Sequence, residues 1–126
     1  MNDYEGTYAI RIHRLARRDI DEAINRMAIF TDEKYATEWH DGLLGKLAAL
    51  AALPKRGPIA EENRLFRIEV RVIPYRFGPG SAIYRVLYSI NEPDEDAPFV
   101  HVLHVRHAAR KPMTRAEAQK IEEDNA

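Results

Sequence analysis

Two stretches near the C-terminal end decide the fold: Ile83-Tyr84-Arg85-Val86-Leu87-Tyr88 and Val102-Leu103-His104-Val105-Arg106-His107-Ala108-Ala109-Arg110. Both are apolar enough to form buried strands, yet each is interrupted by arginine or histidine. A buried strand avoids these residue types unless their charges and hydrogen-bonding groups find partners. We therefore expect the polar insertions to form a basic functional surface at one end of a small sheet.

The segments before these strands predict one more strand and a helical hairpin. Residues 8–13 alternate apolar and polar side chains, as a half-buried strand does. From residue 15 to about residue 27, apolar side chains recur at three- and four-residue spacing, which predicts an amphipathic helix. A second helix is expected to begin after a cap at residues 31–33 and to end near Leu53, before Pro54.

The second helix has an apolar stripe that includes Trp39, which we expect to lie in the core. Gly42 and Gly45 stand inside this helix, where each costs about 1 kcal/mol relative to alanine. We predict that a neighbouring element approaches closely at both glycines.

Three further strands are expected at residues 66–72, 81–90 and 99–106. A capping box at Thr114–Glu117 predicts a short polar helix that leads into an acidic tail. The fold class is therefore α+β, in the order β-α-α-β-β-β, with a mostly antiparallel sheet and the helical hairpin on one face. We expect a single domain over residues 1–126, with its core at about 8–111 and the polar helix and tail at 112–126.

Arginines of the second half are predicted to gather on the sheet face that the hairpin leaves open. Arg67, Arg71 and Arg85 alternate onto one side of the expected strands, and part of the 101–110 segment joins them. Such a patch binds phosphates or an acidic protein segment. The alternative is that these arginines only keep an exposed face soluble.

Three histidines invite a metal site, but strand geometry argues against one. Residues three apart on a strand point to opposite faces, so His104 does not join His101 and His107. The latter two would lie roughly 20 Å apart along the strand. We therefore predict no metal. His107 beside Arg110 is a candidate proton donor or acceptor, and the alternative is a histidine that ends the strand and bonds to the backbone.

The composition excludes several classes of protein. The 126 residues are 45% hydrophobic and 31% charged, carry a formal net charge of −1 and include no cysteine. These values fit one folded domain in a reducing cytoplasm, without disulfides or thiolate metal sites. Residues 1–6 lack the features of a signal peptide, and no apolar stretch is long enough to span a membrane. No glycine-rich phosphate loop or nucleophile elbow is present, and we expect no cofactor.

Several motifs in this order resemble the RelE/ParE superfamily of type II toxin–antitoxin toxins. They are Ala16–Ile20, the Leu-Pro-Lys-Arg-Gly-Pro run at 53–58, Tyr84–Tyr88 and Leu103–Arg110, and the resemblance covers residues 8–111. It implies a small cytoplasmic bacterial protein that arrests growth, serves plasmid stabilisation and is neutralised by a co-encoded antitoxin.

The superfamily includes two activities. ParE-like toxins inhibit DNA gyrase and need no nuclease residues, whereas RelE-like toxins cleave mRNA in the ribosomal A site with a basic cluster. The resemblance places Arg85 at a phosphate-contacting arginine and Arg67 at a basic position of the preceding strand. Glu69 and Ala108 stand where further basic residues are expected, and the C-terminal segment has no tyrosine.

We therefore favour the ParE-like side. In the ribonuclease alternative, Arg85, His107 and Arg110 are the catalytic candidates. Residues expected to bind RNA or a protein partner are Arg67, Arg71, Arg85 and Arg106. A third alternative is a non-catalytic module whose only partner is the antitoxin.

Overall fold

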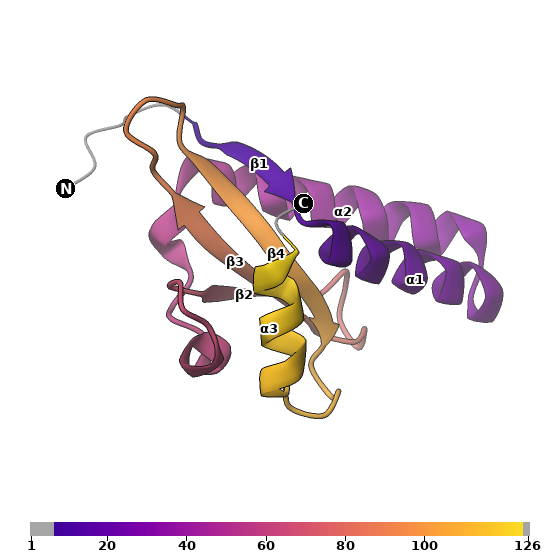
Figure 1. Ribbon diagram of the computed structural model, residues 1–126. Coiled ribbons are helices and arrows are strands. Elements are labelled where there is room, and N and C mark those ends of the chain that lie inside the picture. Colours follow the sequence, from indigo (N-terminus) through magenta and orange to yellow (C-terminus); the bar gives the residue numbers. More distant parts are fainter. Residues whose placement is uncertain (1–6, 125–126) are drawn as a thin grey trace.

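The protein combines a four-stranded sheet with helices, which confirms the expected α+β class. The computed structural model describes residues 7–124. Residues 1–6, where no signal peptide is expected, and residues 125–126 of the expected tail lie outside the described residues. The elements are β1 (Ala9–Ile12), α1 (Arg14–Phe30), α2 (Glu33–Ala52), the 3-10 turns η1 (Pro54–Arg56) and η2 (Glu61–Leu65), β2 (Arg71–Tyr75), β3 (Tyr84–Asn91), β4 (Phe99–His107) and α3 (Arg115–Glu123) (Figure 1).

The sheet has the strand order β1-β4-β3-β2, so the two most apolar strands lie at its centre. β2 pairs with β3, and β3 with β4, in antiparallel fashion, while β1 runs parallel to β4. The mostly antiparallel sheet is therefore confirmed.

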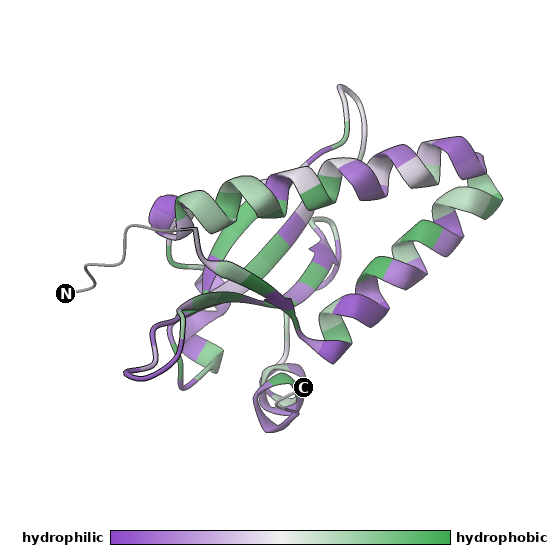
Figure 2. Ribbon diagram, turned by 90° about the horizontal axis from the view of Figure 1, so that it is seen from above, coloured by the Kyte–Doolittle hydropathy of each residue, from purple (hydrophilic) through white to green (hydrophobic). Residues whose placement is uncertain are grey.

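Helices α1 and α2 form the expected hairpin and cover one face of the sheet (Figures 1 and 2). The side chain of Asp32 accepts the Tyr35 backbone N–H at 2.6 Å, which confirms the predicted cap of α2. Trp39 is 1% exposed and lies in the core, as expected. The main core joins Ala16, Ile20, Ala23, Trp39, Leu43, Leu47 and Leu50 of the hairpin to Val86, Tyr88, Val100 and Val102 of the sheet.

The opposite face of the sheet is also covered, and the expectation of an open face is wrong. Helix α3 lies across it, on the side away from the hairpin (Figure 2). A second apolar cluster there consists of Leu15, Ala60, Val70, Leu87, Leu103, Met113, Ala118 and Ile121. The predicted capping box of α3 is present, with Thr114 and Glu117 bonding to each other's backbone N–H. The last helix is therefore part of the core, which extends beyond the expected limit near residue 111.

Strand β2 begins later than expected, because residues 66–70 form a loop. The side-chain carbonyl of Asn63 accepts the Val70 N–H at 2.7 Å, and the Ala60 N–H donates to the Val70 carbonyl at 2.9 Å. These bonds satisfy the backbone groups that a longer strand would have paired. β2 then continues through Pro74 at the sheet edge, where a missing N–H is tolerated.

A bulge interrupts the pairing of β4 with β3. Leu87 pairs with His104 while its neighbour Tyr88 pairs with Val102, so Leu103 is an extra residue on β4. An extra residue breaks the simple alternation of side chains along the strand.

The bulge reverses the predicted arrangement of the histidines. His101 lies opposite Ser89, and His107 lies opposite Tyr84. Because Ser89 and Tyr84 are an odd number of positions apart on β3, their partners point to opposite faces. The prediction that His101 and His107 share a face is therefore wrong.

The two glycines of α2 behave differently. A Cβ atom at Gly42 would overlap the hydroxyl of Tyr75, which donates a hydrogen bond to the Trp39 carbonyl at 2.7 Å. A Cβ atom at Gly45 would meet nothing within 4 Å. The predicted close approach is thus confirmed at Gly42 and wrong at Gly45.

Gly42→Ala and Gly45→Ala form a matched test of this packing. Overpacking of a core costs about 1–3 kcal/mol, which outweighs the roughly 1 kcal/mol that alanine gains in a helix. We expect Gly42→Ala to lower the free energy of unfolding in urea and Gly45→Ala to raise it. Equal effects of the two substitutions would contradict the close approach at Gly42.

Candidate functional site

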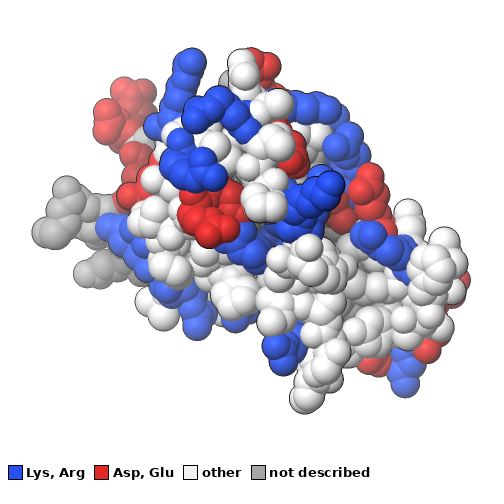
Figure 3. All heavy atoms as spheres, turned by 90° about the horizontal axis from the view of Figure 1, so that it is seen from below, with Lys and Arg blue, Asp and Glu red and all other residues white. Residues whose placement is uncertain are grey.

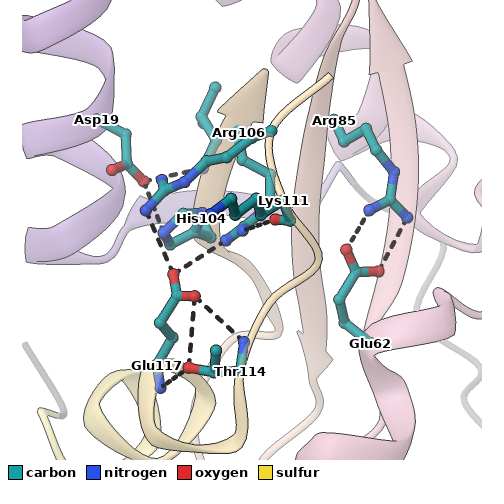
Figure 4. A network of polar contacts seen from close by, with 10 residues as sticks. Asp19, Glu62, Arg85, His104, Arg106, Lys111, Thr114 and Glu117 are labelled. Carbon is teal, nitrogen blue, oxygen red and sulfur yellow. Dashed lines mark hydrogen bonds and ion pairs between the residues drawn. The ribbon is translucent and has the colours of Figure 1, made fainter. Parts of the chain in front are cut away.

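Arg85 is paired with a carboxylate. Its Nη2 donates to Oε1 of Glu62 at 2.9 Å, and its Nη1 donates to Oε2 (Figure 4). Glu62 belongs to η2 and is 5% exposed. Burial opposes ionisation of Glu62, but the hydrogen bonds and charge of Arg85, a backbone hydrogen bond and the charge of Arg106 together outweigh it. They hold the pKa of this carboxyl below its ordinary 4.5. The charge of Arg85 is therefore satisfied within the fold.

Arg106 is buried, with 3% exposure, on the face covered by α3. Its Nη2 donates to the Lys111 carbonyl at 2.8 Å, and its Nη1 lies 3.3 Å from Oε2 of Glu117. The same Glu117 forms the capping box with Thr114, so one carboxylate joins β4, the turn after it and α3 (Figure 4). These contacts make Arg106 a structural residue that connects β4 to the turn after it and to α3.

The predicted cluster of Arg67, Arg71 and Arg85 does not form on an open face. Nε of Arg71 donates to Glu69 at 3.0 Å, and its Nη1 donates to the Gly57 carbonyl at 2.8 Å. Arg67 is exposed but lies in the loop before β2, outside the sheet. The expectation of a shared cationic surface is therefore wrong, because two of these arginines are paired and the third is displaced.

His107 lies where two recesses of about 690 and 480 Å³ adjoin. Arg26, Tyr84 and His107 line both of them. The imidazole packs edge to face on the Tyr84 ring, with 5.3 Å between centroids. Its Nδ1 accepts the Ala109 N–H at 3.0 Å, so the proton-transfer candidate of this site is the other nitrogen, Nε2.

Arg110 lines the smaller recess together with His107, as their predicted association requires. Its Nη2 lies 3.4 Å from Glu117, and half of its side chain is exposed to solvent. An exposed ion pair at this distance contributes little. The guanidinium of Arg110 is therefore available to an anionic ligand.

The three catalytic candidates do not converge. Tyr84 packs in the core on the hairpin side, and the next residue along β3, Arg85, points to the face covered by η2 and α3. His107 and Arg110 share a recess, whereas Arg85 lies on the other side of the sheet. The sequence-based set of Arg85, His107 and Arg110 is thus split in two.

Sequence reasoning missed three residues of this region: Arg26, Glu62 and Glu117. The capping box marked Glu117 as a helix cap, which gave no sign of its contact with Arg106. Glu62 lies 23 residues from Arg85, and no local pattern connects them. The helical periodicity of residues 15–27 does not show that Arg26 borders the end of β4.

Comparison with known families decides the classification of the fold. The sequence matches the family described as "ParE toxin of type II toxin-antitoxin system, parDE" over residues 10–112. The chain belongs to the ParE toxin family. No curated protein sequence matches it. Membership confirms the expected superfamily and implies a cognate antitoxin as partner.

The ParE match begins in β1 and ends before α3. The helix that supplies Glu117 therefore lies beyond the matched part of this ParE-family toxin. Within residues 7–124, no cluster of three or more histidine and acidic side chains is placed to hold a metal ion. None of the described helices is both long and apolar enough to cross a bilayer.

Glu62→Gln tests the pairing of Arg85. The pKa of Glu62 is lowered in the folded state, so its contribution to stability is present above pH 4.5 and is lost as the pH falls through the folded-state value. At pH 7 we expect the substitution to cost about 1–3 kcal/mol, because it weakens a buried charged hydrogen bond. This difference should shrink as the pH is lowered, as measured by chemical unfolding.

Glu61→Gln is the matched control, because Glu61 is an exposed neighbour in η2. It should change stability by less than about 0.5 kcal/mol at pH 7. A Glu62→Gln cost that is absent at pH 7, or that does not depend on pH, would contradict the ion pair.

Proposed function

We propose that this ParE-family toxin arrests growth in the cytoplasm by inhibiting DNA gyrase. The observation that carries the proposal is the neutralisation of the arginines that an RNA-cleaving face would need. Arg85 is paired with Glu62, and Arg106 is buried beside Glu117. The family match supports the same side of the superfamily, because the matched family is the ParE toxin.

Ribosome-dependent RNA cleavage is the second candidate, and one observation favours it. His107 and Arg110 line a common recess that also contains Arg26. A positioned acid or base contributes roughly 10²–10⁴ in rate, and one donor to the transition state about 10²–10³. His107 alone would thus supply the acid or base of a nuclease. The phosphate-binding role that the resemblance assigns to Arg85 would be missing.

His107→Ala separates the two candidate functions in cells that express the toxin without antitoxin. If gyrase is the target, we expect growth arrest and trapped gyrase–DNA complexes, both preserved in the variant. If the protein is a nuclease that uses His107, the substitution should reduce activity by at least about 100-fold. Cut A-site codons in translating ribosomes, lost in Arg85→Ala, would overturn the proposal in favour of RNA cleavage.

A third outcome concerns the non-catalytic alternative. Normal growth of cells that contain the soluble, folded protein would contradict both toxin activities and would leave antitoxin binding as the function. Circular dichroism of the purified protein establishes that the expressed chain is folded, so this outcome is distinguishable from misfolding.

The hairpin end offers an apolar surface for the antitoxin. Ile29 and Phe30 at the end of α1 are 76% and 79% exposed. Phe30 borders the larger recess, which Met27, Tyr35 and Trp39 also line. Figure 3 shows a broad uncharged area on the hairpin side of the molecule, while charged groups gather over the other side. We assign this surface to an apolar segment of the antitoxin, because exposed aromatic anchors beside a recess are typical of interfaces.

Phe30→Ala tests this surface. We expect the affinity for the co-encoded antitoxin, measured by calorimetry, to fall at least about tenfold, the size of a moderate interface anchor. Leu53→Ala removes an apolar side chain that is 64% exposed but does not line this recess, and it should change the affinity by less than about twofold. Equal effects of both substitutions would contradict a localised anchor.

A further inference from the structure

The turn after α2 is held in place by one buried hydroxyl group. Oη of Tyr88, on the central strand β3, donates to the Pro54 carbonyl at 2.6 Å and accepts the Gly57 N–H at 3.1 Å. Tyr88 itself is 0% exposed. Because both backbone groups bond to the same oxygen atom, the chain turns tightly between them. Lys55 and Arg56 of η1 therefore form the tip of the turn.

Further contacts fix the second half of this turn. Nη1 of Arg71 donates to the Gly57 carbonyl at 2.8 Å, and the Val72 N–H donates to the Pro58 carbonyl at 3.0 Å. A Cβ atom at Gly57 would lie 2.5 Å from the Val72 carbonyl oxygen and 2.6 Å from the Tyr88 hydroxyl, so a larger residue would displace the turn. The turn is thus preorganised, and a partner that binds it does not have to order it first.

Buried and exposed residues follow a regular pattern along this segment. Every third residue from Ala51 to Ala60 is buried, and the residues between them are exposed. The aliphatic side chains that flank the turn, Leu53 and Ile59, are 64% and 47% exposed. We call four of these exposed side chains the η1 surface: Leu53, Lys55, Arg56 and Ile59.

The two cations of the η1 surface have no anionic partner in the part of the chain that the structure describes. No carboxylate among residues 7–124 lies within ion-pair distance of Lys55 or Arg56. The acidic residue Glu69, in the loop before β2, is already paired with Arg71 at 3.0 Å. A partner that supplies carboxylates therefore complements this surface.

We infer that the η1 surface is the contact site for the toxin's protein target, and that it binds a target surface whose apolar centre is flanked by carboxylates. Protein interfaces bury apolar side chains at their centre and satisfy charges at the rim. The inference rests on the proposed function only in that the target is a protein.

Two other occupants fit this surface less well. The phosphates of a nucleic acid would neutralise Lys55 and Arg56 but would leave the aliphatic Leu53 and Ile59 in contact with water. A second copy of the chain, bound through the same surface, would bring like charges together. A protein partner with carboxylates satisfies both the cations and the aliphatic side chains.

The η1 surface also lies at the opposite end of α2 from the surface assigned to the antitoxin. Phe30 precedes the start of α2, and Leu53 follows its end (Figure 1). Helix α2 has 20 residues and is therefore about 30 Å long. Substitutions at one end do not alter direct contacts at the other, so target binding and antitoxin binding can be separated by mutation.

Two double variants test the η1 surface, one for each kind of contact. Lys55→Gln/Arg56→Gln removes the cations, and Leu53→Ala/Ile59→Ala removes the aliphatic side chains. We expect each to raise the toxin concentration that half-inhibits supercoiling by purified gyrase at least about tenfold, and to weaken growth arrest in cells without antitoxin. The affinity for the co-encoded antitoxin, measured by calorimetry, should stay within about twofold of wild type, which also shows that the variants are folded.

Matched controls make the same exchanges of residue type elsewhere on the protein. Arg17→Gln/Lys120→Gln removes two exposed cations, and Leu44→Ala/Ile68→Ala removes two aliphatic side chains that are each 44% exposed. Both controls should inhibit gyrase and arrest growth as the wild type does.

Inhibition and growth arrest that persist in both η1 variants would overturn the inference. A loss confined to the charge variant would assign the surface to a nucleic acid, and a loss confined to the aliphatic variant would exclude carboxylates as its partners. A parallel loss of antitoxin affinity would assign the surface to the antitoxin. Each of these results overturns the inference as well.

Failure of the proposed function is distinguishable from failure of this inference. If the wild-type protein arrests growth without inhibiting gyrase, gyrase is not the target, and growth arrest by the η1 variants and their controls still decides the inference. A folded wild-type protein that neither arrests growth nor inhibits gyrase would overturn both.

Discussion

The structure depends on the neutralisation of two arginines on the central strands, the buried Arg106 and the half-buried Arg85. An isolated buried charge is costly, so Arg85 and Arg106 need carboxylates at hydrogen-bond distance. Those carboxylates come from outside the sheet, Glu62 from η2 and Glu117 from α3. The pairing therefore orients the two short elements over the second sheet face, where an apolar cluster that includes Ile121 packs beneath them. Charge pairing and hydrophobic burial act at the same place, which turns an exposed sheet face into a second core.

Much of the fold could be predicted from the sequence, because the relevant signals are local. The alternation in β1, the cap at Asp32, the stop before Pro54 and the capping box of α3 each involve neighbouring residues. The start of β2 could not be predicted, since it depends on the side chain of Asn63 bonding to Val70.

The candidate site was harder to predict than the fold, because its contacts join residues that lie far apart in the sequence. The partners of Arg85 and Arg106 lie in other elements, and periodicity identifies the side of a strand without identifying what covers that side. The histidine geometry failed because the bulge at Leu103 changes the alternation of β4 after residue 102. His107 and Arg110 lie together as expected, because both belong to one short turn at the end of that strand.

The two faces of the sheet thus have different roles. The face under α3 and η2 packs a second apolar cluster that stabilises the fold. The hairpin side bears the larger recess lined by His107 and Trp39, and the exposed apolar end of α1. Interactions with partners are accordingly expected on the hairpin side. In this ParE-family toxin, the paired Arg85 and Arg106 serve the fold.

Guanidinium NMR on the wild-type protein measures the central claim most directly. Rigid pairing of Arg85 and Arg106 with carboxylates restricts rotation about the Nε–Cζ bond and slows hydrogen exchange. The account predicts separate, slowly exchanging Nη–H signals for both residues at neutral pH, with a single averaged signal for the exposed Arg67. Averaged signals for Arg85 and Arg106 as well would show free guanidinium groups and would contradict the closed second face.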